Sequence, residues 1–192
     1  MEFMDVVLSR RSIRRYLDRP ILEEDLTEIL QAGIYAPSAV DLQPWYFVVI
    51  KSKEQMERLI GIMRRVSDKM RPVLEERFAK HPQVIVESTQ FIRQLGGAPV
   101  CILVFQYKSE YKKTVETISQ SIGAAIENML LAATDKGLGS CWLTAPVEVG
   151  VAAELRDTFA PGKGNLLAVV TMGYSDQVPK TPARKEGRYT II

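Results

Sequence analysis

One segment, residues 114–136, restricts the fold of this chain more than any other. Its apolar residues recur at three- and four-residue spacing, the pattern of an α-helix, but their stripe is too broad for a single buried face. Gly137 follows and suits the left-handed turn that ends many helices. We therefore expect a helix that is buried on more than one side. The stripe consists of Ile118, Ile122, Ala125, Ile126, Met129, Leu130 and Ala133.

Shorter helices and apolar strands alternate along the remainder of the chain. Helices are predicted at 3–8, at 23–34, after the capping residue Ser52 and at 147–159, and strands at 45–50, 100–105, 140–144 and 166–172. Residues 64–94 are charged and are predicted to be helical in pieces, broken at Pro72 and Pro82. A chain of 192 residues is long enough for a core of its own, so we expect one domain over 1–192.

Composition argues against several classes of protein. The net charge is only +2, and Lys and Arg are interleaved with Glu and Asp, which does not favour binding to nucleic acid. No segment has the run of about 18 apolar residues that a membrane span needs, and the start has early acids and no signal-peptide pattern. A cytoplasmic protein without a membrane partner is expected. Cys101 and Cys141 are predicted to be buried free thiols, and His81 is the single histidine, so no metal site is expected.

A cluster of cationic side chains follows the first predicted helix. Arg10, Arg11 and Arg14 surround Ser12, and guanidinium groups with a hydroxyl at a turn suit the oxygens of a phosphate. The alternative is that the arginines complement the dipole of the helix C-terminus and stay solvated. A second segment, residues 37–45, follows at a distance that suits a site for a phosphorylated cofactor. The cluster alone does not decide between these interpretations.

Three motifs together resemble the signatures of the nitroreductase family of flavin enzymes. They are Arg10-Arg11-Ser12-Ile13-Arg14-Arg15-Tyr16, then Ala36-Pro37-Ser38 through Gln43-Pro44-Trp45, then Leu131-Ala132-Ala133 through Gly137-Leu138-Gly139-Ser140-Cys141-Trp142. Their order and spacing match the family over almost the whole chain. The resemblance implies an α+β fold with a central, mainly antiparallel sheet flanked by helices. It also implies an interlocked homodimer with FMN at each of two sites in the interface, and the apolar end of the tail, residues 175–192, is expected to dock on the partner subunit.

The resemblance also implies roles for the cationic residues. The residues that match the family segment holding the FMN phosphate, ribityl chain and pyrimidine edge are Arg10, Arg11, Ser12 and Arg14. Arg184, in the tail, corresponds to a basic position that usually completes the phosphate pocket.

Two further segments match parts of the family that approach the flavin ring. Pro37, Ser38 and Ala39 match a loop that approaches from the other subunit. The strand end whose backbone passes the ring and donates an amide near N5 corresponds to Trp142, Leu143, Thr144 and Ala145. Asp41 is a departure, because many relatives have Asn there. It either lies near the ring, where its charge disfavours the anionic reduced flavin, or pins the loop, and we favour the loop interpretation.

The implied activity is transfer of hydride from NADH or NADPH to N5 of FMN and then to a nitroaromatic, quinone or related small acceptor, with ping-pong kinetics. The flavin carries this chemistry, so no side chain is assigned a catalytic role. Residues 64–94 and 108–113 are expected to form the lid. Three alternatives to this activity are considered. The first is a relative that fragments the flavin or removes a halogen, and the second is an FMN-binding redox sensor without turnover. The third is a nucleic-acid or phosphoprotein binder that uses the arginines.

Overall fold

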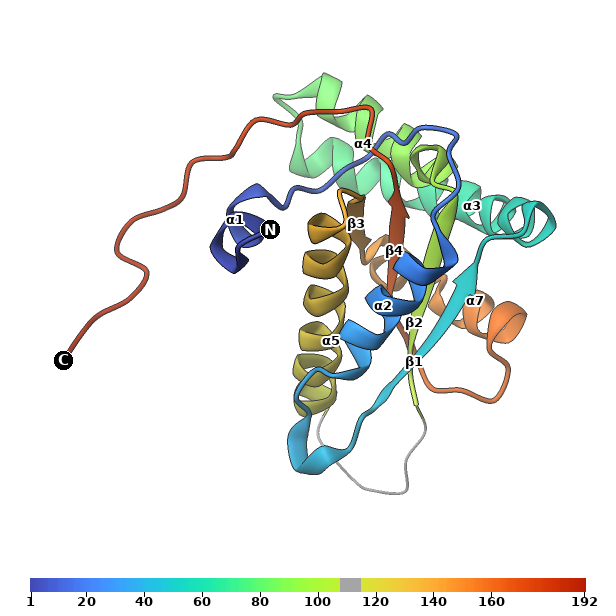
Figure 1. Ribbon diagram of the computed structural model, residues 1–192. Helices are drawn as coiled ribbons and strands as arrows, with labels where there is room; N and C mark the ends of the chain where they lie inside the picture. The colour runs from blue at the N-terminus through green and yellow to red at the C-terminus, as the bar shows by residue number, and fades with distance from the viewer. Residues whose placement is uncertain (108–114) are drawn as a thin grey trace.

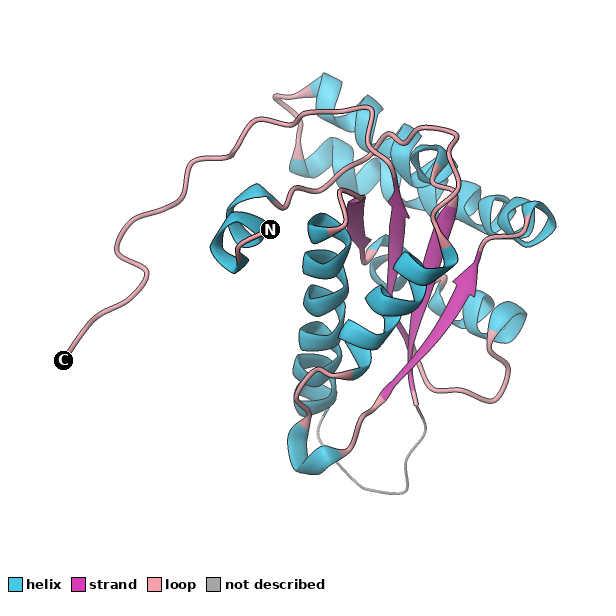
Figure 2. Cartoon of the chain, viewed as in Figure 1, coloured by secondary structure: helices cyan, strands magenta, loops and turns pink. Residues whose placement is uncertain are grey.

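The computed structural model describes residues 1–107 and 115–192 of the chain. In these residues four strands form one antiparallel sheet in the order β1-β2-β4-β3, and helices cover both of its faces (Figures 1 and 2). The strands are β1 (Trp45–Ile50), β2 (Val100–Gln106), β3 (Gly139–Leu143) and β4 (Leu166–Gly173). The α+β fold with a central antiparallel sheet flanked by helices is therefore confirmed.

The two faces of the sheet are covered by different sets of helices (Figure 1). One face carries α2 (Glu23–Ile34) and α5 (Val115–Asp135). The other carries α3 (Lys53–Arg77), α4 (Pro82–Gln94), α6 (Ala145–Glu148) and α7 (Ala152–Phe159). Single turns of 3-10 helix, η1 (Ala39–Asp41) and η2 (Leu95–Gly97), lie in the connections.

The inner strands are buried on both faces, which explains their unbroken apolar sequences. In β2, Ile102 and Val104 point to the α5 side, whereas Cys101 and Leu103 point to the α3 side. Period-two alternation sends successive side chains to opposite faces, so both faces of a central strand need apolar residues. Both cysteines are buried free thiols, as predicted.

Helix α5 is buried on more than one side, as its sequence predicts. Ile122, Ile126 and Met129 are completely buried between the sheet and α2. Gly33 permits the close approach of α2, because a Cβ at this position would lie 2.8 Å from Cγ of Met129. The amide of Asn128 also donates to the carbonyl of Ala32 at 3.0 Å.

Two predicted helix boundaries are wrong. The break at Pro72 does not occur, because α3 continues through it to Arg77, and the buried face that includes Met70 and Leu74 packs on α4 and outweighs one lost backbone hydrogen bond. The break at Pro82 is correct, since α4 begins there. The single helix predicted at 147–159 is two helices, because Gly150 adopts a φ of 71° and turns the chain between α6 and α7.

The first helix and the tail lie apart from the sheet (Figure 1). α1 (Phe3–Ser9) exposes Phe3, Met4 and Leu8, although Val6 is buried. Residues 176–192 form no helix or strand and end in exposed Tyr189, Ile191 and Ile192. None of the helices in the described ranges combines the length and the apolar character that crossing a membrane requires.

Candidate functional site

The arginine segment, residues 10–14, lies along the free edge of β3. Ser12 forms a parallel bridge with Ser140, and the backbone N–H of Ile13 donates to the carbonyl of Ser140 at 2.9 Å. Gly139 makes this approach possible, because a Cβ there would lie 2.7 Å from Cγ1 of Ile13. The fold therefore places the arginine segment beside the strand that leads to residues 142–145.

The three predicted arginines are only partly neutralised by the chain. Nε of Arg10 lies 3.2 Å from a carboxylate oxygen of Glu127 on α5. The guanidinium of Arg11 donates to the hydroxyl of Thr181, and that of Arg14 lies 5.8 Å from the centre of the Phe91 ring. Among these partners, Glu127 supplies one negative charge, whereas the three guanidinium groups carry three positive charges. The segment therefore keeps a surplus of positive charge, which suits an anion.

A buried tyrosine anchors the end of the arginine segment. The hydroxyl of Tyr16 donates to the carbonyl of Ile13 at 2.7 Å and lies 2.8 Å from Oγ1 of Thr171 on β4. Burial raises the pKa of Tyr16 well above its ordinary value, so the phenol stays neutral. The backbone N–H of Tyr16 also donates to the carbonyl of Gly96 in η2 at 3.1 Å.

Ser140 has an unusual hydroxyl next to this segment. The residue is 1% exposed, and its Oγ has no hydrogen-bond partner within residues 1–107 and 115–192. Buried hydroxyls are nearly always paired, so one without a partner beside a cationic segment points to a polar ligand. The arginine segment and this orphaned hydroxyl beside it fit a phosphorylated group such as FMN.

Cys141 follows Ser140 but faces the other side of β3. Burial raises the pKa of the Cys141 thiol, against the opposing effects of Arg14, a hydrogen bond from Ser12 and Arg10. The thiol therefore remains protonated, which argues against a nucleophilic role.

The strand end at residues 142–145 lies on the same side of α5 as Arg10. The Trp142 side chain is 39% exposed, and its ring lies 3.6 Å from the Cβ that Gly123 would carry. Gly123 and Glu127 are four residues apart and thus share a helix face. Thr144 is exposed, whereas Leu143 and Ala145 are buried. The structure thus brings the arginine segment and this strand end together.

The loop at residues 37–41 lies away from the arginine segment of the same chain (Figure 1). The N–H of Ala39 donates to Oγ of Ser121 at 3.3 Å, so the loop contacts a different part of α5 from Arg10. Pro37, Ser38 and Asp41 therefore do not reach the arginine segment within one chain.

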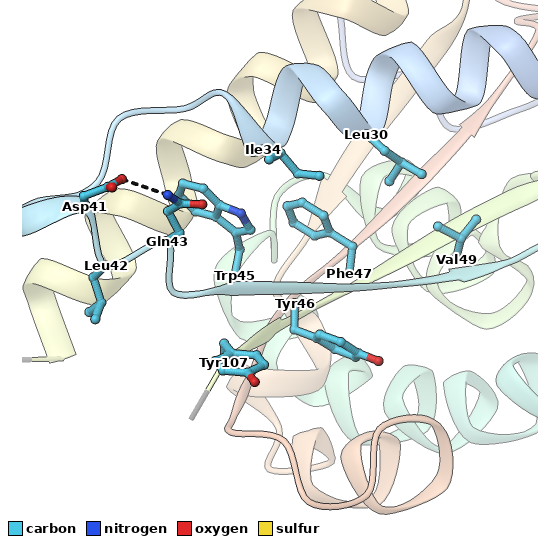
Figure 3. Close-up of a pocket in the computed structure, with 10 residues that line it drawn as sticks. All are labelled: Leu30, Ile34, Asp41, Leu42, Gln43, Trp45, Tyr46, Phe47, Val49 and Tyr107. Carbon is cyan, nitrogen blue, oxygen red and sulfur yellow. Dashed lines mark hydrogen bonds between the residues drawn. The ribbon is translucent and has the colours of Figure 1, made fainter. Parts of the chain in front are cut away.

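The loop has a fixed and strained backbone beside a cavity of about 660 Å³ (Figure 3). Val40 has a φ of 51° and Asp41 a φ of 53°, and a β-branched residue rarely adopts this conformation. A carboxylate oxygen of Asp41 accepts from the amide of Gln43 at 2.8 Å, and Oγ of Ser38 accepts from its N–H at 3.0 Å. These contacts suit the role of Asp41 as a loop pin. The cavity is lined by Leu30, Ile34, Asp41, Leu42, Gln43, Trp45, Tyr46, Phe47, Val49 and Tyr107.

The beginning of the tail runs beside the arginine segment. Tyr16 forms an antiparallel bridge with Ser175, and Oε1 of Gln177 accepts from the backbone N–H groups of Arg14 and Arg15. Thr181, the partner of Arg11, is three residues before Arg184, a span of about 10 Å when extended. Arg184 is exposed and lies within chain reach of the cluster that it is predicted to complete.

Sequence reasoning did not identify three residues of this site: Glu127, Ser140 as a polar ligand group, and Gln177. Ser140 carried the single usable signal, since it is a polar residue in an otherwise apolar strand. In the described ranges, no group of three or more His, Cys, Asp or Glu side chains could hold a metal ion. The predicted lid at 108–113 lies outside the described residues, whereas 64–94 forms most of α3 and α4.

Comparison with known proteins gives consistent matches. The model of the nitroreductase family matches residues 7–174. An Archaeoglobus fulgidus protein provisionally named NADH dehydrogenase/NAD(P)H nitroreductase is 32% identical over 90% of this chain and 85% of its own length. The iodotyrosine deiodinase of Thermotoga neapolitana is 30% identical over 93% of this chain and 91% of its own. The crystal structure of a nitroreductase with bound FMN from Bacteroides fragilis is 26% identical, with a TM-score of 0.72 over 100% of this chain and 99% of that one.

Proposed function

Because the chain belongs to the nitroreductase family, we propose that it is an FMN-dependent oxidoreductase that takes hydride from NADH or NADPH and passes it to a small-molecule acceptor. The nitroreductase from Bacteroides fragilis, which has FMN bound, supports the cofactor, and the relative named for NAD(P)H supports the donor. Nitroaromatics and quinones are the acceptor classes we would expect. A cytoplasmic location stays a prediction.

The observation that carries this proposal is the arginine segment beside β3. Its surplus of positive charge and the orphaned hydroxyl of Ser140 lie next to a strand end that exposes Trp142. Arg10, Arg11, Ser12 and Arg14 would hold the phosphate, ribityl chain and pyrimidine edge of FMN, and Arg184 would close the phosphate pocket from the tail. The backbone of Trp142, Leu143, Thr144 and Ala145 would pass the ring and orient it.

When bound, FMN supplies the hydride-accepting position at N5, and the chain supplies binding and orientation. The arginine charge anchors the cofactor and stabilises negative charge that develops at the pyrimidine edge. Donor and acceptor would use the same exposed face in turn, which predicts ping-pong kinetics. No side chain of the site needs to act as a general acid or base, because solvent can supply the proton.

A homodimer would complete the site. In one chain, Pro37, Ser38 and Ala39 lie away from the arginine segment, so they would approach the flavin of the partner subunit. The exposed apolar residues of α1, Phe3 and Leu8 among them, favour an interface between copies.

The tail, residues 175–192, would dock on the partner subunit through its apolar end, because Ser175, Gln177 and Thr181 contact the arginine segment of their own chain. β1 is an edge strand of the described sheet, and the cavity of Figure 3 lies along it. The exposed apolar residues Tyr189, Ile191 and Ile192 suit this groove. Replacing Ile191 and Ile192 by Asp should convert the dimer to a monomer in size-exclusion chromatography with light scattering. An unchanged dimer would exclude the tail as an arm of the interface.

Visible absorbance of the purified protein, with anaerobic addition of NADH and then NADPH, tests the function. Flavin bands that bleach with a pyridine nucleotide and return with a nitroaromatic or quinone are expected. A double variant, Arg10→Ala with Arg14→Ala, should lose FMN. A colourless protein that cannot be reconstituted with FMN would contradict the proposal, and a yellow protein that never bleaches would instead be a sensor without turnover.

Reductive dehalogenation is a second candidate, favoured by the 30% identity with the iodotyrosine deiodinase over 93% of this chain. Anaerobic addition of 3-iodotyrosine to the reduced protein separates the two activities. Return of the oxidised flavin bands with release of iodide would assign dehalogenation, whereas no reaction with 3-iodotyrosine and rapid reaction with a quinone would exclude it.

A further inference from the structure

The apolar groove along β1 carries a charge at one end. It is the cavity of Figure 3, and among the described residues that line it Asp41 is the only charged one. Asp41 lies near the start of β1, whereas Leu30 and Val49 lie toward the opposite end of the groove (Figure 3). A groove of this kind suits an extended apolar segment with a cation at one end.

The carboxylate of Asp41 is exposed and its charge is not neutralised by its own chain. One oxygen, Oδ1, accepts from the side-chain amide of Gln43 at 2.8 Å. Within residues 1–107 and 115–192, Asp41 forms no ion pair. The contact with Gln43 fixes the direction of the side chain. The loop therefore presents a fixed negative charge at this end of the groove.

The tail has the complementary order of residues. Arg188 is exposed and stands directly before Tyr189-Thr190-Ile191-Ile192, whose large apolar side chains are also exposed. Residues 188–192 cover about 13 Å when extended, the same length as residues 45–49 of β1. With Arg188 at Asp41, the apolar residues that follow therefore extend along the groove as far as Val49.

The groove that receives this segment belongs to a second copy of the chain. The hydroxyl of Thr181 accepts from Arg11, so the tail is held beside β3 up to this point, and β3 and β1 are opposite edges of the sheet. Figure 1 shows the end of the tail directed away from the sheet. In the described sheet β1 pairs with β2 alone, so its outer edge offers backbone hydrogen bonds to another extended segment.

We propose that Asp41 is the docking point for the partner subunit's Arg188, and that this ion pair sets the position and direction of the tail in the groove. This inference rests on the homodimer of the proposed function. Each dimer has two such pairs, because a two-fold interface repeats every contact. The charge of Asp41, where many relatives have Asn, thereby gains a role in assembly beside its role in the loop.

Cross-linking tests the placement of the two residues. In a variant with Asp41→Cys and Arg188→Cys, a short bismaleimide should join the two positions and give a covalent dimer on a denaturing gel. Cys101 and Cys141 are buried and do not compete for the reagent. Asp41→Cys alone and Arg188→Cys alone are the controls, and both should run as monomers.

Removal of charge tests the contribution of the pair and does not depend on the cysteine variants. Asp41→Asn keeps an acceptor for Gln43 and suits the left-handed backbone at a φ of 53°. Asp41→Asn and Arg188→Gln should each accelerate subunit exchange about tenfold, and the double variant should be no faster than either. Native mass spectrometry of isotope-labelled and unlabelled protein measures the exchange. Lys185→Gln, the same loss of charge elsewhere in the tail, should leave the rate within about twofold.

The inference is wrong if the double cysteine variant links within one chain or stays unlinked. It is also wrong if the effects of Asp41→Asn and Arg188→Gln multiply in the double variant, which indicates two independent contributions. These outcomes leave FMN binding and hydride transfer intact. If light scattering shows that the unaltered protein is a monomer, the homodimer of the proposed function and this inference fail together.

Discussion

Nε of Arg10 lies 3.2 Å from Oε1 of Glu127, so a carboxylate of α5 stands inside the arginine cluster. The pair links the segment after α1 to the face of α5 that also faces Trp142. A carboxylate in this position neutralises one guanidinium and repels an incoming phosphate. The site is therefore held in order without a ligand, at some cost in affinity for the anion.

Replacing Glu127 with Gln should strengthen FMN binding severalfold, because the competing charge is removed while a hydrogen-bond acceptor for Arg10 remains. The gain should be largest at low ionic strength, where charge interactions are least screened. Both side chains are partly exposed, so the stability change should stay within about 0.2–1 kcal/mol. Glu57→Gln on the exposed side of α3 is the control. Weaker FMN binding by Glu127→Gln would show that the carboxylate orients Arg10 instead of competing for it.

Replacing Tyr16 with Phe should lower the free energy of unfolding by about 1–3 kcal/mol, because it leaves the buried carbonyl of Ile13 without the phenol donor. Urea unfolding followed by circular dichroism measures the change. Tyr35→Phe is the matched control, since Tyr35 is 85% exposed and should show no effect. Equal stability of the two variants would mean that the Tyr16 hydroxyl contributes nothing to the anchor.

The stability of the protein should decrease at high pH because of the raised pKa of Tyr16. Burial raises the pKa of this phenol above the value of 10.0 that it has in the unfolded chain. Its contribution is fully present below pH 10 and is lost as the pH rises above it, because only the unfolded state then releases the proton. Unfolding midpoints between pH 9 and 11 should therefore fall more steeply for the unaltered protein than for Tyr16→Phe.

Neither cysteine should react with a thiol reagent such as DTNB in the folded protein at pH 8. Burial raises the pKa of Cys101 to about 12 and also raises that of Cys141, and both side chains are inaccessible. In guanidinium chloride the two thiols of the sequence should both react. Rapid labelling of Cys141 under native conditions would show that the edge of β3 opens beside the arginine segment.

Two helical glycines should respond in opposite directions to alanine. Gly33→Ala brings a Cβ to within 2.8 Å of the fully buried Met129 side chain, and it should cost about 1–3 kcal/mol of stability. Gly61 in α3 has open space around its Cβ position, so Gly61→Ala should gain about 0.5–1 kcal/mol. Thermal unfolding of both variants checks the pair, and a destabilising Gly61→Ala would contradict the packing of α3.

Much of the fold follows from local sequence pattern. The bounds of α2 and β1 agree with prediction to the residue, because the acidic first turn of one and the apolar run of the other are local signals. Pro72 misled the prediction because the face that holds α3 together is supplied by α4, which no local pattern reveals. Gly150 caused the opposite error, a break between α6 and α7 that was not predicted, because a glycine within a helical pattern does not by itself indicate a left-handed turn.

The site was predictable only in part for the same reason. The anion preference of the arginine segment is local, and the sequence contains it. Glu127, Ser140 and Gln177 belong to the site through α5, β3 and the tail, so their contribution depends on pairing over more than a hundred residues. Which side chains surround Arg10 and Arg14 is therefore a property of the tertiary structure.

The hydrogen bonds between Gln177 and the arginine segment have a consequence for the synthesis of the chain. Residues 14 and 15 leave the ribosome early, but the acceptor that orders them is added 162 residues after Arg15. Contacts of such long range form late in folding. A growing chain therefore lacks this contact until translation is nearly complete, so the arginine segment reaches its final order only when synthesis is almost finished.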